Sequence, residues 1–119
     1  MPGTNNVIDF LESGLKAEFF RHKAIANNLA NLRTPGYRTI DVKFKELLAK
    51  AMESSGKVDF NEITPEFYHP GLTPIKSNDN DVSIDAEVGK MVENSLRHDT
   101  YIRLLHKKYS QIELAINVS

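Results

Sequence analysis

Apolar residues recur at intervals of three and four near both ends of this chain, and the middle of the chain lacks the pattern. A repeat that averages about 3.5 residues is typical of helices that pack along a partner helix. We therefore predict two long helices that pack against each other as an antiparallel pair. The predicted seam between them consists of Leu11, Leu15, Ile25, Leu29, Val88, Met91, Ile102, Leu105 and Tyr109.

Polar residues interrupt both halves of the predicted seam near their centres. In an antiparallel hairpin, Glu18 of the first half faces His98 of the second, and His22 faces Ser95. A polar layer inside a coiled coil fixes the register of its helices, so we expect these four residues to form a register layer. The alternative is a metal site, but a closed zinc site needs four ligands. No two histidines of the chain are spaced four residues apart.

Proline, glycine and capping residues predict where the helices begin and end. We expect one domain over residues 1–119, with an N-terminal helix at 7–32, a loop-rich insert at 33–82 and a C-terminal helix at 83–117. Three of the five prolines lie in the insert between residues 57 and 82. The insert should carry a short amphipathic helix from Phe44 to Ser54, with room for a small β-hairpin around Val58 to Ile63. The predicted fold class is mainly α, an antiparallel coiled coil with this insert.

The composition argues against several classes of function. The formal net charge is −1, which gives no electrostatic footprint for nucleic acid. The chain has no cysteine, so disulfides and thiolate chemistry are excluded. It contains no nucleophile elbow and no phosphate-binding loop, and the acidic run from Asp79 lacks the glycine and glutamate of a calcium loop. We expect no enzyme activity, no cofactor, no metal and no small-molecule substrate.

Neither a membrane span nor a cleavable leader is expected. No stretch approaches the ~20 apolar residues that a spanning helix needs. Residues 1–6 are not basic, and no long apolar run follows them. The apolar content of 40% suits a thin helix pair rather than a thick core. We therefore expect neighbouring subunits to cover the exposed side chains of Phe10, Phe19, Val92 and Leu96.

An asparagine-rich stretch at the end of the first helix needs a physical reason, because asparagine is a poor helix former. One explanation is that the amides satisfy carbonyl groups that the helix end leaves without partners. The other explanation is a recognition surface for a neighbouring molecule, and both can hold. The helix-exit motif consists of Asn27, Asn28, Asn31, Thr34, Pro35, Gly36 and Tyr37.

Two stretches of this sequence resemble the bacterial flagellar rod and hook protein family. The first is Ile25-Ala26-Asn27-Asn28-Leu29-Ala30-Asn31 with Thr34-Pro35-Gly36-Tyr37-Arg38, which is similar to the N-terminal signature of the family. The second is Asn80-Asp81-Val82-Ser83-Ile84-Asp85-Ala86-Glu87 with Asn94-Ser95-Leu96-Arg97, which resembles the C-terminal region of proximal-rod members. The resemblance covers roughly residues 8–48 and 78–116. One departure is His98, where the family pattern has an aromatic residue.

The resemblance implies a structural role in the proximal rod of the flagellar basal body. The terminal helices would assemble into a tube that transmits torque and surrounds the export channel. Implied partners are other copies of the chain, related rod proteins, basal-body ring and export-gate components, and the flagellar type III export apparatus. After export without a cleaved signal, the chain would lie in the periplasmic rod. The alternative is a cytosolic coiled-coil adaptor or export chaperone that binds a partner helix.

Overall fold

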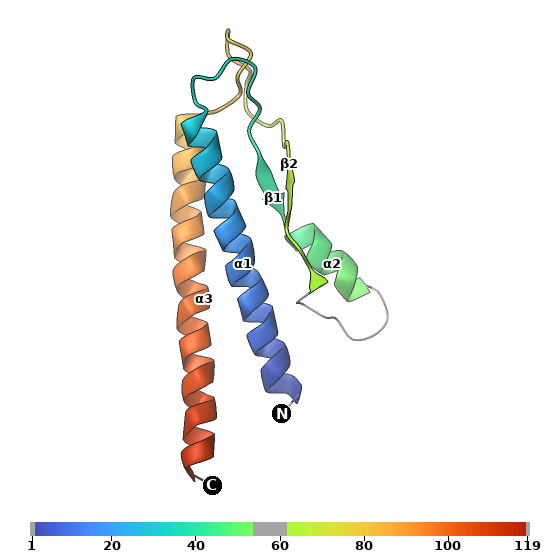
Figure 1. The fold of residues 1–119 in the computed structure, drawn as a ribbon, viewed down its shortest axis with the longest axis vertical. Helices are drawn as coiled ribbons and strands as arrows, with labels where there is room; N and C mark the ends of the chain where they lie inside the picture. Colours follow the sequence, from blue (N-terminus) through green and yellow to red (C-terminus); the bar gives the residue numbers. More distant parts are fainter. Residues whose placement is uncertain (1, 54–61, 119) are drawn as a thin grey trace.

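Two long helices lie side by side, and a small arm is attached along one of them (Figure 1). The computed structural model describes residues 2–53 and 62–118, with side chains for most of them. Helix α1 spans Pro2–Ala30 and helix α3 spans Ile84–Val118, and the two run antiparallel. The molecule is elongated, with extents of 66 × 31 × 14 Å. The predicted mainly α fold class is confirmed.

The two long helices begin and end close to the predicted positions, for recognisable reasons. Helix α1 starts at Pro2, earlier than expected, and proline is well suited to a first helical position. It ends at Ala30, before the turn that contains Gly36 at a φ of 75°. At the start of α3, Ser83 Oγ accepts a hydrogen bond from Ala86 N at 3.3 Å and caps the helix. The C-terminal end of α3 extends beyond the N-terminus of α1 (Figure 1).

The arm consists of a two-stranded antiparallel sheet and a short helix. Strand β1 spans Asp41–Lys43, strand β2 spans Glu66–Tyr68, and Val42 pairs with Phe67 at their centre. Helix α2 spans Lys45–Glu53, which matches the predicted short helix within one residue at each end. Most of the hairpin predicted around Val58 to Ile63 lies outside the described residues, and the observed strands lie on either side of that segment.

Helix α3 is turned relative to the predicted seam. Its buried positions are Glu87, Asn94 and Leu105, each facing α1, with Tyr101 half-buried among them. The predicted seam placed Val88, Met91 and Tyr109 in the interface, and the structure leaves Val88 and Met91 exposed. Tyr109 is also exposed, but its hydroxyl donates to Glu12 Oε1 of α1 at 3.0 Å. Of the remaining predicted seam residues, Leu11, Ile25 and Leu105 are buried, whereas Leu15, Leu29 and Ile102 are half-buried.

A close contact between the helices explains this rotation. A Cβ atom at Gly14 would lie 2.3 Å from the ring of Tyr101, so the aromatic ring rests directly on the backbone of α1. Farther along, Asn28 of α1 donates a hydrogen bond to Glu87 of α3 at 3.0 Å. Together these contacts rotate α3, so that Leu105 stays buried against α1 whereas Val88 and Met91 are exposed.

The interior of the helix pair is unusually polar. Glu18, Asn28, Asn80 and Glu87 are the largest side chains that are almost completely buried. Within the described ranges, every buried side-chain nitrogen and oxygen has a hydrogen-bond partner. An unpaired buried polar group costs about 1–3 kcal/mol, so each of these hydrogen bonds contributes to holding the helices in place. Among residues 2–53 and 62–118, no helix is long and apolar enough to cross a membrane.

Candidate functional site at the helix exit and the outer face

Asn28 is the centre of the helix-exit junction, which we define as residues 27–40 and 76–87. Its amide nitrogen donates to the carbonyl oxygen of Ile40 at 2.9 Å and to Glu87 Oε2 at 3.0 Å. Its amide oxygen accepts hydrogen bonds from the Tyr37 hydroxyl at 2.7 Å and from Ile40 N at 2.9 Å. An asparagine side chain has two donors and a carbonyl oxygen with two lone pairs, so Asn28 is saturated. It thereby joins α1, the segment after it, and α3.

Tyr37 connects the two adjacent asparagines of α1. Its hydroxyl donates to Asn28 Oδ1 and accepts a hydrogen bond from Asn27 Nδ2 at 2.7 Å. Burial raises the pKa of Tyr37 above its usual value, the hydrogen bond from Asn27 opposes this, and the nearby carboxylates of Glu87 and Asp81 raise the pKa further. The hydroxyl therefore keeps its proton and remains available as a donor to Asn28.

Asn80 caps the end of α1 from the other side of the junction. Its amide nitrogen donates to the carbonyl oxygens of Asn31 at 2.9 Å and Thr34 at 2.7 Å. Its amide oxygen accepts a hydrogen bond from Val82 N at 2.7 Å. Carbonyl groups at a helix C-terminus lack partners within the helix, and this long-range cap supplies them. Asn31 contributes a local bond, from Nδ2 to the carbonyl oxygen of Asn27 at 2.8 Å.

The backbones of the two segments are also joined directly. Gly36 N donates to the carbonyl oxygen of Asn78 at 3.0 Å, and the positive φ of Gly36 favours glycine at this turn. Thr39 N donates to Asp81 Oδ1 at 2.6 Å. Arg38 forms an ion pair with Asp79 at 2.8 Å. These contacts bring the two family-like stretches of the sequence together into one structural unit.

The helix-exit motif is therefore divided between buried and exposed positions. Asn28 is buried, Asn31 and Tyr37 are half-buried, and the other members are exposed: Asn27, Thr34, Pro35 and Gly36. Sequence reasoning did not include Asn80, Asp81 or Glu87 among the site residues. The signal that could have identified them was the second family-like stretch, which contains all three.

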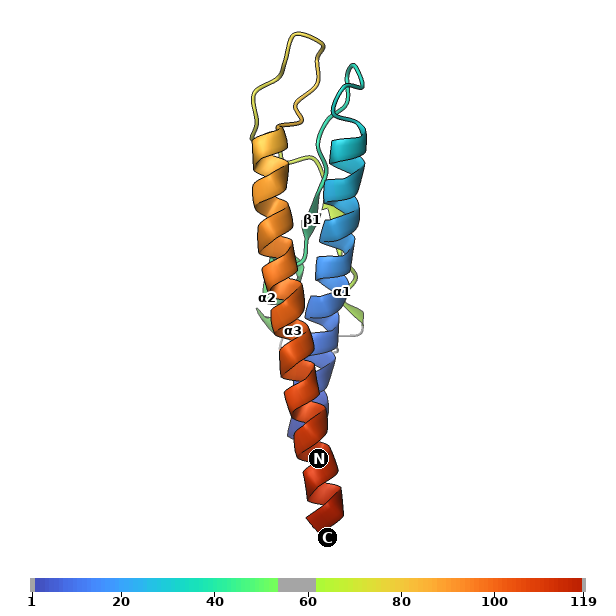
Figure 2. The ribbon, with the colours of Figure 1, turned by 90° about the vertical axis from the view of Figure 1, so that its left-hand side faces the viewer.

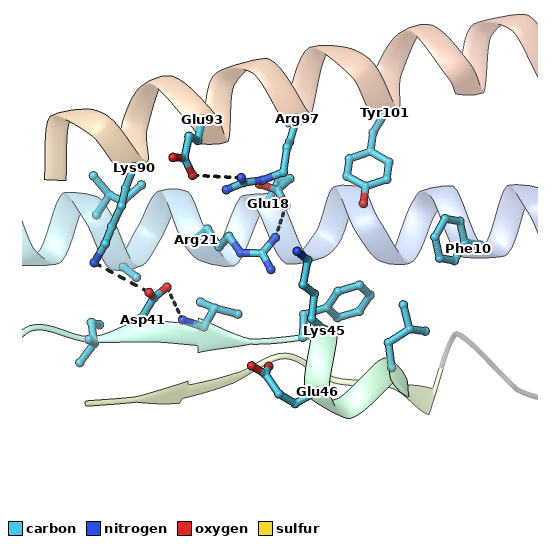
Figure 3. Close-up of a pocket in the computed structure, with 16 residues that line it drawn as sticks. Phe10, Glu18, Arg21, Asp41, Lys45, Glu46, Lys90, Glu93, Arg97 and Tyr101 are labelled. Carbon is cyan, nitrogen blue, oxygen red and sulfur yellow. Dashed lines mark hydrogen bonds and ion pairs between the residues drawn. The ribbon is translucent and has the colours of Figure 1, made fainter. Parts of the chain in front are cut away.

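Of the four residues of the predicted register layer, Glu18 is buried in the interface, whereas His22, Ser95 and His98 are exposed. Glu18 is buried and forms ion pairs with Arg21 and with Arg97, whose Nε lies 2.7 Å from Glu18 Oε1 (Figure 3). Asn94 Nδ2 donates to the carbonyl oxygen of Glu18 at 2.8 Å. The partners of Glu18 on α3 are therefore Asn94 and Arg97. Each precedes a predicted partner, Ser95 or His98, by one position, in agreement with the rotation of α3.

All four residues of that layer nevertheless line one groove between α1 and α3. His22, Ser95 and His98 are exposed and surround a hollow of about 310 Å³. Glu18, Phe19, Asn94 and Asp99 also line it. Across the described residues, no group of three or more histidine, aspartate or glutamate side chains is arranged to hold a metal ion.

A larger cavity of about 470 Å³ separates the arm from the helix pair. Phe10, which we expected to face a neighbouring subunit, is half-buried and lines this cavity opposite Tyr101 and Lys45 (Figure 3). Lys90 reaches across from α3 and lies 3.8 Å from Asp41. Charges of both signs line the cavity, and the ion pair between Lys90 and Asp41 joins the arm to α3 beside it.

Helix α3 also presents an exposed apolar stripe. Figure 2 shows the molecule with α3 in front. The stripe is unusual because large aliphatic side chains follow one another along a single helix without cover from the chain. We name it the outer face, and its residues are Phe19 of α1 and Ile84, Val88, Met91, Val92 and Leu96 of α3.

Comparison with known proteins gives a consistent family. A family model described as "Flagella basal body rod protein" matches residues 8–38, which contain most of α1 and the first part of the junction. The chain is similar to the flagellar basal body rod protein FlgB of Bacillus subtilis (strain 168), with 25% identity over 121 residues and 94% of each chain covered. It is 27% identical over 110 residues to FlgB of Aeromonas hydrophila, covering 81% of each chain. It is 31% identical over 90 residues to FlgB of Aquifex aeolicus, covering 70% of each chain.

Proposed function

This chain belongs to the FlgB family of flagellar basal body rod proteins, and we propose that it builds the proximal part of the rod. It is a structural subunit of the basal body rod and not an enzyme. Within the rod, its terminal helices assemble with those of its neighbours into a tube. The tube transmits torque and surrounds the export channel.

The outer face is the observation that carries this proposal. It exposes aliphatic side chains along α3, including Val92 at 54% and Leu96 at 64% of their surface. Burying apolar surface contributes about 25 cal/mol per Å², so contacts between copies along this stripe favour assembly. Contacts between two different patches of the same chain generate rings or helical filaments, which is the symmetry that a tube needs.

The helix-exit junction supports the transmission of torque. A subunit that carries torque must keep the angle between its helices and its arm under load. The saturated amide of Asn28 and the cap made by Asn80 tie α1, α3 and the arm together at one end of the hairpin. The exposed members of the helix-exit motif, such as Asn27 and Pro35, remain available for a neighbouring subunit.

The partners we propose are other copies of this chain and related rod proteins. Basal-body ring components and the export gate lie at the ends of such a rod and are further proposed partners. We propose that the flagellar type III export apparatus delivers the chain, without a cleaved signal, to the periplasmic rod. A cytosolic adaptor or export chaperone would instead use the outer face to bind a single partner helix.

Deletion of the gene, combined with localisation of the protein, tests the proposed function. Cells that lack the chain should be non-motile and should lack complete rods, and a copy on a plasmid should restore both. The tagged protein should copurify with intact basal bodies. Normal rods in the deletion strain would reject the structural role. A tagged protein that remains in the cytosol, bound to one partner, would support the adaptor or chaperone instead.

A further inference from the structure

The arm and α3 are both attached to α1, with the arm on one side of it and α3 on the other (Figure 1). Strand β1 packs along α1, and the ring of Phe67 in β2 meets the ring of Phe20 in α1 edge to face, with centroids 5.7 Å apart. Packing along a single helix leaves rotation of the arm about that helix weakly restrained. A contact with α3, which lies off this line, restrains the remaining angle.

Lys90 makes such a contact from α3. Its ammonium nitrogen lies 3.8 Å from Asp41 Oδ2, at the start of β1 (Figure 3). Within residues 2–53 and 62–118, this is the one ion pair between α3 and the arm. The other carboxylate oxygen, Asp41 Oδ1, accepts a hydrogen bond from Val42 N at 2.7 Å. The strand itself therefore orients the carboxylate toward α3.

The ion pair closes a ring of contacts through three elements. Lys90 Nζ also lies 3.4 Å from Glu87 Oε1 of its own helix, and Glu87 is 1% exposed. Glu87 Oε2 accepts from Asn28 of α1, whose side-chain amide exchanges two hydrogen bonds with the backbone of Ile40. Ile40 directly precedes Asp41, which leads back to Lys90. A closed ring restrains the orientation of α1, α3 and β1 more than separate contacts do.

The ion pair is weak enough to position the arm without holding the fold together. The side chains of Lys90 and Asp41 expose 34% and 31% of their surface. An ion pair with this much access to water changes an equilibrium by at most about fivefold, and salt screens it. The cavity of about 470 Å³ between the arm and the helices gives the arm room to move.

We propose that Lys90 is the positioning residue of the arm, and that its ion pair with Asp41 sets the angle between the arm and the helix pair. When the ion pair is broken, the arm pivots about α1. The helix pair keeps its register, because the contacts of Tyr101 with Gly14 and of Arg97 with Glu18 do not involve the arm. In a rod, the ion pair would keep the arms of successive copies in one orientation. That consequence rests on the proposed function, whereas the angle of the arm is a property of the single chain.

Distances between spin labels on the purified full chain test this role. The chain has no cysteine, so labels can be attached at Ala49→Cys in α2 and Arg103→Cys in α3, both at exposed positions. A second labelled pair, Lys16→Cys in α1 with Arg103→Cys, reports on the helices alone. An excess of unlabelled chain limits the signal to distances within one molecule. Double electron–electron resonance then gives the distribution of each distance.

Asp41→Asn is the test variant, because it removes the charge and keeps the oxygen that accepts from Val42 N. The share of molecules with a displaced arm should rise about two- to fivefold, which broadens the distances between α2 and α3. The distances between α1 and α3 and the melting temperature should not change. Lys90→Arg should keep the distribution of the wild type, since its guanidinium still pairs with Asp41.

Glu46→Gln is the matched control. It removes a carboxylate that lines the same cavity from the arm and that forms no ion pair with any described residue, so the arm should keep its position. Sodium chloride at about 1 M gives a second measurement, since it screens exposed charges. It should broaden the distances between α2 and α3 in the wild type and add little in Asp41→Asn.

Three results would overturn the positioning role of Lys90. These are unchanged distances between α2 and α3 in Asp41→Asn, an equal change in Glu46→Gln, and broadening of the distances between α1 and α3 to the same extent. The measurements use the purified chain and do not depend on rods. Normal rods in the deletion strain would therefore reject the proposed function and leave the role of Lys90 in the single chain intact.

Discussion

Asn27 and Asn28 are adjacent and chemically identical, yet they differ in burial and in the number of hydrogen bonds that their side chains make. Asn28 is buried and its side chain makes four hydrogen bonds, whereas Asn27 is exposed and its side chain donates one, to Tyr37. Successive residues on a helix point in directions about 100° apart, which explains the difference. The sequence alone indicated that the amides satisfy carbonyl groups, but it could not show which amide is central. The decisive partners, Ile40 and Glu87, lie far away in sequence.

We expect Asn28→Ala to lower the free energy of unfolding by about 3 kcal/mol, because it leaves Ile40 N–H and the Glu87 carboxylate short of partners. Asn27→Ala is the matched control and should change it by less than about 1 kcal/mol, since one exposed bond is lost. Urea unfolding of both variants measures the difference. Equal effects would show that the junction does not depend on the buried amide.

Tyr37 should make the stability of the protein depend on alkaline pH. In the unfolded chain a tyrosine loses its proton near pH 10, whereas burial and the charges of Glu87 and Asp81 raise the pKa of Tyr37 in the folded protein. The folded state therefore binds this proton more tightly. The resulting stability is fully present below pH 10 and is lost as the pH rises through the raised pKa.

Tyr37→Phe tests this pH dependence. The variant should be less stable at neutral pH, because it loses the bond to Asn28 Oδ1. Its stability should also fall less steeply than that of the wild type above pH 10, with Tyr68, Tyr101 and Tyr109 unchanged as a common background. Urea unfolding at several pH values gives both quantities. Parallel pH profiles for the two proteins would contradict the raised pKa of Tyr37.

At the scale of the elements, periodicity identified which residues share a face but not what covers that face. Positions such as Val88 and Met91 do lie on one side of α3, yet that side is exposed, and Glu87 and Asn94 face α1 instead. An apolar stripe can be covered by another subunit as well as by the same chain, and the sequence pattern is identical in both cases. The hydrogen bond by which Asn80 caps Asn31 could not be predicted from neighbouring residues either, because the two lie 49 positions apart in the sequence.

Two glycines within the long helices should respond in opposite ways to alanine. A Cβ at Gly14 would lie 2.3 Å from the Tyr101 ring, so Gly14→Ala should destabilise the protein by about 1–3 kcal/mol. A Cβ at Gly89 would meet nothing within 4 Å, so Gly89→Ala should stabilise it by up to about 1 kcal/mol. Thermal unfolding of the two variants measures both changes. Stabilisation by both alanines would mean that α1 and α3 are not held in this register.

At the scale of the whole molecule, the elongated shape separates surfaces with different tasks. The junction holds the two helices and the arm together at one end. The arm lies beside α1, with α3 on the other side of α1, and α3 carries most of the outer face (Figure 1). Stability within one chain and association between chains should therefore be separable by mutation.

Aspartates on the outer face should abolish association without unfolding the monomer. Val92→Asp with Leu96→Asp places charges at positions that are already exposed, so the melting temperature should barely change. The same charges would be buried at a contact between copies, where an unpaired charge is strongly unfavourable. Sedimentation at increasing concentration should show loss of association in vitro, and rods should fail to form in cells.

Leu105→Ala is the matched variant for the interior of the helix pair. Leu105 is buried, so this change should cost about 2–5 kcal/mol of unfolding free energy and lower the melting temperature. At temperatures where it remains folded, its outer face is intact and it should still associate. If the aspartate variant instead lost as much stability as Leu105→Ala, the apolar stripe of α3 would have to pack within its own chain, and assembly through the outer face would fail.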